Sequence, residues 1–451
     1  MATTLIRNAS VIATCDDADR LFQDADIRIR DNRIEAIGAD VAGEGPVDEV
    51  IDASGHILIP GMVNTHHHFY QTLTRNLPAG QDSNLFNWLV AHYPIWARLD
   101  GRAIEIATRV AIAELMLSGC TTAADHTYIW PNGARIDDQI AAAAEMGFRF
   151  HASRGSMSVG ESAGGLPPDH AVEDEYFILE DSQRVIETHH DDRDGAMTRI
   201  VLAPCSPFSV STDLMRETAR LGRAYGVHMH THLAETRDEE DYCRAQFGQT
   251  PVEYAEANDW VGDDVWFAHM VHPHAAEIDR LGAHRCGVAH CPSSNMRLAS
   301  GIAPVKALQQ AGARVGLGVD GSASNDSSHM LSEARQAMLL QRLANGPDAL
   351  SARDTLRLAT RGGAEVLGRG DIGQLAPGMA ADIVGYRLDS LPLAGGAVHD
   401  PLAALVFCLP PRVDLSLING RLRVHRGELL GVDLPALVRE HNAIATRLVD
   451  G

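Results

Sequence analysis

The sequence is that of an acidic chain of 451 residues, long enough for one large domain with an appendage or for two to three domains. Its formal net charge of -22 leaves no surplus of basic residues to neutralise phosphates, so nucleic acid and anionic membranes are not expected as partners. No apolar stretch is long enough to span a bilayer, and no signal peptide is evident. The 7 cysteines are scattered and odd in number, which favours reduced thiols in a cytoplasmic protein.

The two ends of the chain carry patterns of short β-strands. Residues from about 4 to 50 show apolar–polar alternation broken by Asn, Asp and Gly, with a hairpin turn predicted at Asp31-Asn32. Similar patterns return after about Gly373, and the tail predicts a closing helix. Neither end is large enough for a full domain. We therefore predict one small β-sandwich built from residues 1–58 and 373–451, with the helix at its C-terminal end.

The central part, residues 59–372, alternates short apolar strands with amphipathic helical stretches. Strands are predicted within 62–68, 120–128, 148–156, 200–208, 227–235, 264–272, 287–295 and 315–323. Repeated β–α units imply a parallel sheet, and eight of them predict a closed (β/α)8 TIM-like barrel, an α/β fold. The polar residues capable of chemistry stand at the C-terminal ends of these strands, where such barrels carry their active sites.

Three consecutive histidines, His66, His67 and His68, end the first predicted barrel strand. Alternate side chains of an extended chain share a face, so His66 and His68 point the same way and make half of a metal site. The fifth strand ends in a second pattern, H-x-x-E, formed by His232 and Glu235. An isolated H-x-H is more often solvated. Here the apolar strand before the histidines and the H-x-x-E pattern far downstream together favour a metal centre.

Further candidates stand at other strand ends. His228 and His230 share the strand face of His232, which is favoured because it lies nearest the end of the strand. His269 ends the sixth strand and Asp320 ends the eighth. Each residue alone is more often structural. Together, at successive strand ends of one barrel, they predict a single functional site.

Three imidazoles and one carboxylate suit one divalent ion, either zinc or ferrous iron. We assign as its ligands His66, His68, His232 and Asp320. Water in an open position on such an ion has a pKa of roughly 7 instead of about 15.7. Asp320 can take the proton of that water, Glu235 can protonate a ring nitrogen of a substrate, and His269 can hydrogen-bond the hydroxide and steady the tetrahedral centre.

In these motifs the chain resembles the amidohydrolase superfamily, and within it the deaminases and chlorohydrolases that use one metal ion. The motifs are PGMVNTHHH, HLAET, AHMVH, CPSSNMRLASGIAP, LGVDGSASND and GQLAPGMAADIV, in that order over nearly the whole chain. The resemblance implies the barrel, the β-sandwich from both termini, one zinc or iron ion and hydrolytic removal of an amine or halide from a heterocycle. It also implies the same four ligands, Glu235 with His269 as acid/base groups, and a homo-oligomer.

The substrate is indicated by weaker similarities. HHHFYQTLTRNLP, FHASRGSMSVGESAGGLPPD and LAPCSPFSVS resemble segments of 8-oxoguanine deaminases and, less closely, of isoxanthopterin deaminases. This resemblance implies attack of water at C2 of 8-oxoguanine, release of ammonia and formation of uric acid. Rival substrates are a pterin, an adenosine of the S-adenosylhomocysteine type, and a triazine losing amine or chloride. A rival of another class is a non-catalytic barrel scaffold, which the complete ligand set and Glu235 disfavour.

A pocket for such a ring needs a few fixed donors and acceptors among apolar walls. The residues expected to bind it are Gln71, Trp88, Tyr128, Arg154 and Cys205, and Trp96 is a further residue that could stack on the ring. Gln71 can read an amide edge of the ring, Arg154 can hold a carbonyl oxygen, and the two tryptophans can stack on the base. The alternatives are that Arg154 pairs with an acidic neighbour, Cys205 fills space, and each tryptophan packs in the core or in a lid.

Overall fold

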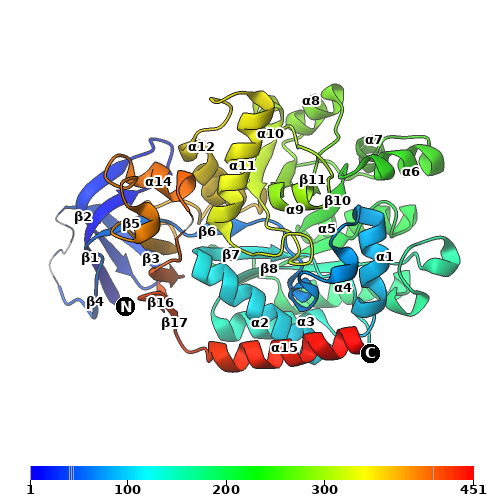
Figure 1. Cartoon of the computed structure of the whole chain (residues 1–451), viewed down its shortest axis with the longest axis horizontal. Coiled ribbons are helices and arrows are strands. Elements are labelled where there is room, and N and C mark those ends of the chain that lie inside the picture. Colours follow the sequence, from blue (N-terminus) through cyan, green and yellow to red (C-terminus); the bar gives the residue numbers. More distant parts are fainter. Residues whose placement is uncertain (1, 40, 42, 44, 410) are drawn as a thin grey trace.

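A computed structural model describes residues 2–39, 41, 43, 45–409 and 411–451 of the chain, and its centre is a closed parallel barrel (Figure 1). The barrel strands are β6 (Met62–Asn64), β7 (Cys120–Asp125), β8 (Arg149–Ser156), β9 (Thr198–Pro204), β10 (His228–Leu233), β11 (Val265–His269), β12 (Gly287–His290) and β13 (Arg314–Leu317). Neighbouring strands pair in parallel, and β13 pairs with β6 to close the ring. The predicted (β/α)8 barrel is confirmed.

Helices surround this barrel and connect its strands. They are α1 (Leu85–Trp96), α2 (Gly101–Ser118), α3 (Ile136–Met146), α4 (Glu175–His189), α5 (Thr212–Tyr225), α6 (Arg237–Phe247), α7 (Pro251–Ala257), α8 (Ala275–Ala283), α9 (Pro292–Arg297), α10 (Val305–Ala311), α11 (Met330–Asn345), α12 (Ala352–Arg357) and α13 (Gly363–Val366). Capping residues set several of their starts: Asp100, Ser211 and Thr236 accept backbone N–H groups of α2, α5 and α6. Gly119, at φ 94°, ends α2 in the left-handed region just before β7.

The two ends of the chain build a separate mixed sheet, at the left of Figure 1. Its strands are β1 (Thr3–Ala13), β2 (Leu21–Arg30), β3 (Arg33–Gly38), β4 (Glu49–Asp52), β5 (His56–Pro60), β14 (Ile383–Arg387), β15 (Leu415–Ile418), β16 (Arg421–His425) and β17 (Glu428–Leu429). The antiparallel pairing of β5 with β14 joins the two ends of the chain, and Asp31-Asn32 forms the predicted turn between β2 and β3. The predicted β unit from both termini is confirmed, with its nine strands hydrogen-bonded into one sheet around a shared apolar core.

The sheet is connected to the barrel through one tight junction. Gly61 lies between β5 and β6, and a Cβ placed on it would lie 2.1 Å from Thr121 Oγ1 at the start of β7. Only glycine allows this close approach without displacing its neighbour. The junction therefore carries the chain directly from the sheet into the strand that precedes the three histidines.

The C-terminal helix α15 (Leu434–Asp450) packs on the barrel side of the molecule, along the bottom of Figure 1. It lies against α2 and against η1 (Phe69–Thr74), the short 3-10 helix that follows the histidines. His441 Nε2 is 3.0 Å from Thr72 Oγ1, and Arg98 donates to the Leu448 carbonyl at 2.9 Å. The end of the chain thus supports the segment that directly follows the first two candidate ligands.

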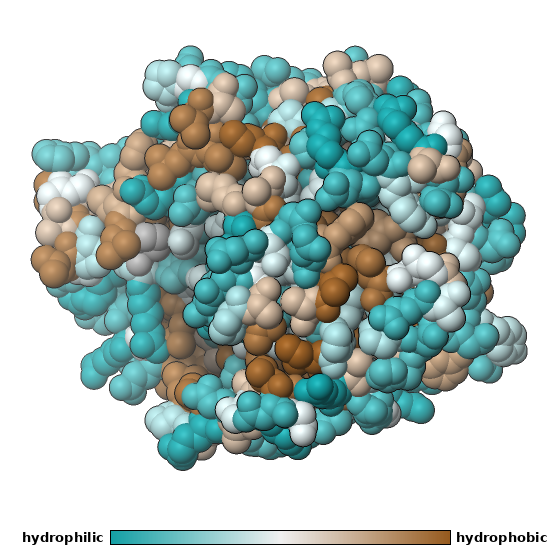
Figure 2. Space-filling model, turned by 45° about the vertical axis from the view of Figure 1, so that its right-hand side comes forward, coloured by the Kyte–Doolittle hydropathy of each residue, from teal (hydrophilic) through white to brown (hydrophobic). Residues whose placement is uncertain are grey.

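The surface seen in Figure 2 is largely hydrophilic, with brown residues gathered in separate groups. This polarity agrees with the high acidic content of the sequence. Within the described ranges, no helix combines the length and apolar character needed to cross a membrane. Short helical turns complete the chain: η2 (Pro78–Gly80), η3 (Glu161–Ala163), η4 (Asp169–Ala171), η5 (Leu358–Gly362), η6 (Leu391–Leu393) and α14 (Pro401–Phe407).

A buried ion pair ties the barrel to the sheet, and its loss is expected to destabilise the fold. Arg149 on β8 donates through Nε and Nη2 to both carboxylate oxygens of Asp382 at 3.0 Å, and both side chains are buried. Arg149→Met leaves the Asp382 carboxylate buried and unpaired, which costs about 3–5 kcal/mol. Denaturant unfolding should show this loss, whereas Arg193→Met, which removes an exposed pair with Asp191, should change stability by less than about 0.5 kcal/mol. Equal effects of the two substitutions would contradict this role of the buried pair.

Candidate metal centre and substrate pocket

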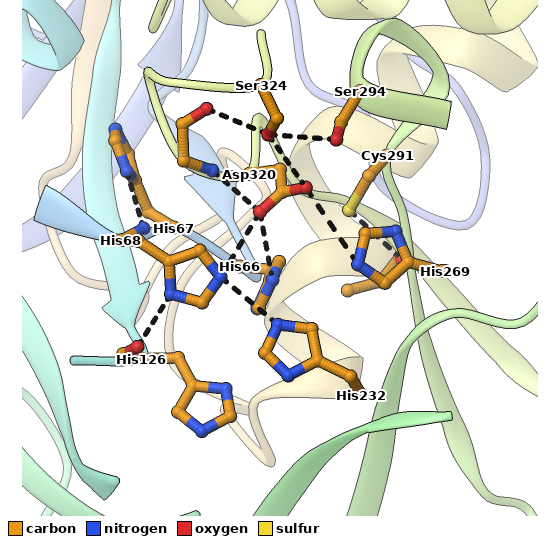
Figure 3. A network of polar contacts seen from close by, with 12 residues as sticks. His66, His67, His68, His126, His232, His269, Cys291, Ser294, Asp320 and Ser324 are labelled. Atoms are coloured by element: carbon orange, nitrogen blue, oxygen red, sulfur yellow. Dashed lines mark hydrogen bonds and ion pairs between the residues drawn. The ribbon is translucent and has the colours of Figure 1, made fainter. Parts of the chain in front are cut away.

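The C-terminal ends of three barrel strands bring the predicted metal ligands together. His66 and His68 follow β6, His232 lies in β10, and Asp320 follows β13. His68 Nε2 lies 3.1 Å from His232 Nε2, and Asp320 Oδ1 lies 3.3 Å from the Nε2 atoms of both His66 and His68. Figure 3 shows these side chains pointing toward one another from different strands. Residues separated by up to 254 positions thus share one centre, because parallel strands of a barrel end at the same rim.

The donor set at this centre fits a divalent cation. Within the described residues, His66 Nε2 is buried and makes no hydrogen bond of acceptable geometry. Burial lowers the pKa of His66 well below its usual value and that of His232 to about 3, so both rings present lone pairs. Burial by itself raises the pKa of Asp320, but its contacts with His66 and His68 hold that pKa well below the usual range. Buried lone pairs facing a buried carboxylate are the donors that zinc and ferrous iron bind.

Backbone carbonyls orient two of these rings. His68 Nδ1 donates to the His126 carbonyl at 2.6 Å, and His232 Nδ1 donates to the Cys205 carbonyl at 2.6 Å. A carbonyl only accepts, so the hydrogen of each neutral ring is on Nδ1 and the lone pair of Nε2 faces the centre. His66 Nδ1 instead contacts a side chain, His230 Nε2, at 2.8 Å. Sequence patterns do not reveal these partners, because strand carbonyls have no side-chain signature.

Two site residues adopt strained backbone conformations. His269 has φ 73° and Asp320 has φ 62°, in the left-handed region that residues other than glycine rarely occupy. Ala234, directly before Glu235, has φ 53°. Such conformations cost about 1–3 kcal/mol each and concentrate at functional sites. Here they turn the chain at the strand ends and direct the side chains into the centre.

Glu235 and His269 stand beside the four candidate ligands. His269 Nε2 lies 3.6 Å from Glu235 Oε2 and 3.8 Å from Asp320 Oδ2. Burial raises the pKa of Glu235, and the charge of Asp320 adds to this, while His269 opposes it. Burial lowers the pKa of His269, but the charges of Glu235 and Asp320 outweigh burial and raise it. The pKa of the Glu235 carboxyl and that of the His269 imidazole are therefore both raised, so each group holds a proton more readily than it would in water.

Supporting residues missed by the sequence analysis hold this pair. Asn295 Oδ1 accepts from His269 Nδ1 at 2.9 Å, and Glu239 accepts the backbone N–H groups of Ala234 and Glu235 at 2.9 and 2.8 Å. Burial raises the pKa of Glu239 to about 7. Asn295 lies inside the CPSSN motif and Glu239 follows HLAET, so the motifs contained both residues without indicating their roles.

A cavity of about 420 Å³ opens beside the centre. Four of the predicted substrate-binding residues line it, namely Gln71, Trp88, Tyr128 and Cys205. Its polar end is formed by Glu235, His269 and three of the candidate ligands, and the walls away from the centre are mainly apolar, including Leu89, Phe208 and Leu298. Gln71 is buried and its Oε1 has no hydrogen-bond partner in the described chain. A Cβ on Gly321 would lie 1.8 Å from this oxygen, so a glycine after Asp320 makes room for the amide.

The structure corrects the substrate-binding prediction for Arg154. Arg154 does not line the cavity: its guanidinium donates to Asp181 at 2.7 Å, to Glu173 at 2.8 Å and to the Gly155 carbonyl at 2.6 Å. Asp181 belongs to α4, so Arg154 points from β8 into the helical layer. The paired state considered as the alternative is the one observed.

Trp96 is likewise a packing residue and not part of the cavity wall. It is fully buried, donates from Nε1 to Thr74 Oγ1 at 3.0 Å, and packs against Tyr70 and Trp88. Its neighbour Trp88 does reach the cavity, with Nε1 bound to the Ala323 carbonyl at 3.1 Å. The two tryptophans lie eight positions apart on α1, and only the first reaches the cavity.

A parallel barrel with three imidazoles and a carboxylate at one rim, beside a partly apolar cavity, is the architecture of a metal-dependent hydrolase. Residues 57–423 match the amidohydrolase family, and the chain belongs to it. The chain is 49% identical to the 8-oxoguanine deaminase of Pseudomonas aeruginosa, with 100% of both chains covered. It is 37% identical to an isoxanthopterin deaminase of an unidentified prokaryote, covering 99% of this chain and 97% of that protein.

A solved structure extends the comparison to three dimensions. The atrazine chlorohydrolase of Arthrobacter aurescens TC1, crystallised with zinc, superposes with a TM-score of 0.93 at 35% identity. The match covers 98% of this chain and 100% of that one. The fold is therefore shared over nearly the whole of this chain and all of the other.

Removal of a candidate ligand is expected to remove the metal. Asp320→Asn replaces the anionic donor by a neutral amide, so the protein should lose most of its bound ion and its activity. Elemental analysis after gel filtration should give about one divalent ion per wild-type chain and far less in the variant. The exposed His284 offers a control, since His284→Asn should retain the ion. Full metal content in Asp320→Asn would refute its assignment as a ligand.

Proposed function

We propose that the protein is a metal-dependent aminohydrolase that converts 8-oxoguanine and water to uric acid and ammonia. The observation that carries this proposal is the 49% identity to the Pseudomonas aeruginosa 8-oxoguanine deaminase over the full length of both chains. In the reaction the C2–amino bond breaks, a new C2–oxygen bond forms from water, and the amine leaves as ammonia. The rim residues provide a proton acceptor, a proton donor and a cationic hydrogen-bond donor for this exchange.

We propose zinc as the ion, held by His66, His68, His232 and Asp320. The donor set fits either zinc or iron, and the zinc in the similar chlorohydrolase structure supports zinc. A divalent ion in this place supplies an electrophile that lowers the pKa of an attacking water from about 15.7 to roughly 7.

The chain's own residues then move the protons. Asp320 Oδ2 faces away from His66 and His68 and toward His269, where it can accept a proton from the attacking water. The raised pKa of Glu235 favours the protonated carboxyl, and in that form it can deliver a proton to the ring nitrogen beside C2. His269 is held by Asn295 with Nε2 toward the centre, and in its protonated form it donates to the oxygen that gains charge.

The cavity suits a flat, polar ring. Gln71 presents an acceptor that has no partner among the described residues and an amide N–H₂ donor, which together match an N–H and C=O edge of an oxidised purine. Trp88 and Tyr128 provide aromatic wall, and the indole of Trp88 is fixed by its bond to Ala323. A buried acceptor left unpaired is costly, so Gln71 favours rings that offer a donor at this position.

A pterin or a triazine in the same pocket would use the same proton transfers, as would an adenosine derivative. The full-length match at 49% favours the purine base over the pterin, whose deaminase is 37% identical. A non-catalytic scaffold would need neither Glu235 beside the candidate ligands nor a cavity at the centre. A homo-oligomer stays a prediction from the family resemblance.

The substrate assignment is tested by ammonia release from zinc-loaded protein. The panel is 8-oxoguanine, guanine, isoxanthopterin, S-adenosylhomocysteine, cytosine and a chlorotriazine. We expect kcat/KM for 8-oxoguanine to exceed that for guanine by more than about 100-fold, because guanine lacks polar groups that a dedicated pocket would pair. Uric acid should form in equal amount to ammonia. A higher kcat/KM on another ring would show that the proposed substrate is wrong and that the roles given to the pocket residues need revision.

The role of Glu235 is tested by Glu235→Gln. The variant keeps the four ligands but cannot deliver a proton, so kcat should fall by about 10²- to 10⁴-fold while the metal content stays near one per chain. Glu217→Gln, on the exposed face of α5, is the matched control and should leave kcat unchanged. Normal turnover by Glu235→Gln would show that another group carries the proton.

A further inference from the structure

The three candidate histidine ligands are not oriented in the same way. His68 and His232 each donate from Nδ1 to a backbone carbonyl, which no side-chain substitution can remove. His66 alone uses a side chain, because its Nδ1 lies 2.8 Å from His230 Nε2. The orientation of His66 therefore depends on the chemistry of residue 230.

His230 is itself held by a carbonyl. Its Nδ1 lies 2.9 Å from the backbone oxygen of Trp266 on β11, and a carbonyl oxygen can only accept. The hydrogen of a neutral His230 ring is then on Nδ1, which leaves Nε2 as an acceptor. His66 Nδ1 must be the donor in the contact between the two rings. The lone pair of His66 is consequently on Nε2, the buried atom that faces the centre and makes no hydrogen bond of its own within the described chain.

Trp266 contacts both His230 and the backbone beside His66. Its indole stacks on the His230 ring, with centroids 4.6 Å apart and an interplanar angle of 16°. Its Nε1 donates to the carbonyl of Thr65 at 3.1 Å, directly before His66. One residue of β11 thus restrains both the ring of His230 and the backbone from which His66 projects. His230 is fully buried and does not line the substrate cavity.

We propose that His230 is a positioning residue for the metal centre, which accepts the Nδ1 hydrogen of His66 and so presents His66 Nε2 as a ligand. The proposal rests on the metal centre described above but not on the identity of the substrate. Groups that orient metal-binding imidazoles in this way are worth about 10- to 100-fold in metal affinity.

The test compares two substitutions with opposite chemistry. His230→Leu fills the space beside Trp266 but offers no acceptor, so the zinc dissociation constant should rise by about 10- to 100-fold. His230→Gln places an amide oxygen near the former Nε2 position and should restore the constant to within about threefold of wild type, a difference worth less than about 1 kcal/mol. Affinity is measured on the full-length apoprotein by competition with a chromogenic chelator, without any substrate.

A matched control comes from the same strand. His228 lies two positions earlier on the same face of β10 and is not among the contacts of the centre, so His228→Leu should bind zinc like wild type. The cobalt-loaded forms give a second readout: His230→Leu should alter the visible absorption of the ion, and His230→Gln and His228→Leu should not. Thermal unfolding of each apoprotein shows whether the variant is folded.

Each outcome decides the proposal. If His230→Leu binds zinc with wild-type affinity, the proposal is wrong, because His230 then has no role at the centre. If His230→Leu and His230→Gln lose zinc affinity equally, the proposal is also wrong, because the loss then reflects packing and not the hydrogen bond to His66. If His230→Leu does not fold, His230→Asn, too short to reach His66, takes its place with the same expectation. A wild-type protein that binds no zinc would overturn the metal centre and this role together, whereas zinc binding without deamination would overturn only the proposed substrate.

Discussion

The buried carboxylate of Asp320 is the group on which the rest of the site depends. An ionised carboxylate in a protein interior costs several kcal/mol unless it is compensated. Here the Gly321 backbone N–H donates to Oδ1 at 2.6 Å, Ser324 Oγ donates to Oδ2 at 3.3 Å, and the imidazoles of His66 and His68 approach Oδ1. A bound cation would complete the compensation. The left-handed backbone of Asp320 is tolerable because these contacts determine its position.

The closed barrel orients the histidine rings of the metal centre through backbone carbonyls of neighbouring strands. The carbonyls of His126, Cys205 and Trp266 come from three different strands or strand ends, β7, β9 and β11. Each one sets the ring of a histidine that belongs to a neighbouring strand. Strand pairing and ligand orientation are therefore one property of the fold, since a shift in register would move a carbonyl away from its ring.

The strands and the rim residues were predictable because each follows from a local pattern. Short apolar runs ending in polar residues located all eight barrel strands, and two-residue alternation placed His66 and His68 on one face. Partners were not predictable, because they depend on packing between distant segments. Arg154 ends a barrel strand as expected, but its length and charge let it reach Asp181 on α4. The tautomer of His66 is set, through His230, by the Trp266 carbonyl on β11, three strands away around the barrel, and such a carbonyl has no sequence signature.

The arrangement separates chemistry from ring recognition. The candidate ligands and proton carriers stand on barrel strands or directly at their ends, whereas Gln71 and Trp88 lie on η1 and α1, within the long connection between β6 and β7. That connection can change shape without disturbing the carbonyls that orient the histidines, because those carbonyls belong to the barrel. Relatives named for a purine, a pterin and a triazine, at 35–49% identity and over nearly full length, fit this division. Overall sequence similarity is therefore better evidence for the proton transfers at the rim than for the identity of the ring in the pocket. The buried amide of Gln71 is the feature of this chain that bears most directly on the identity of the ring.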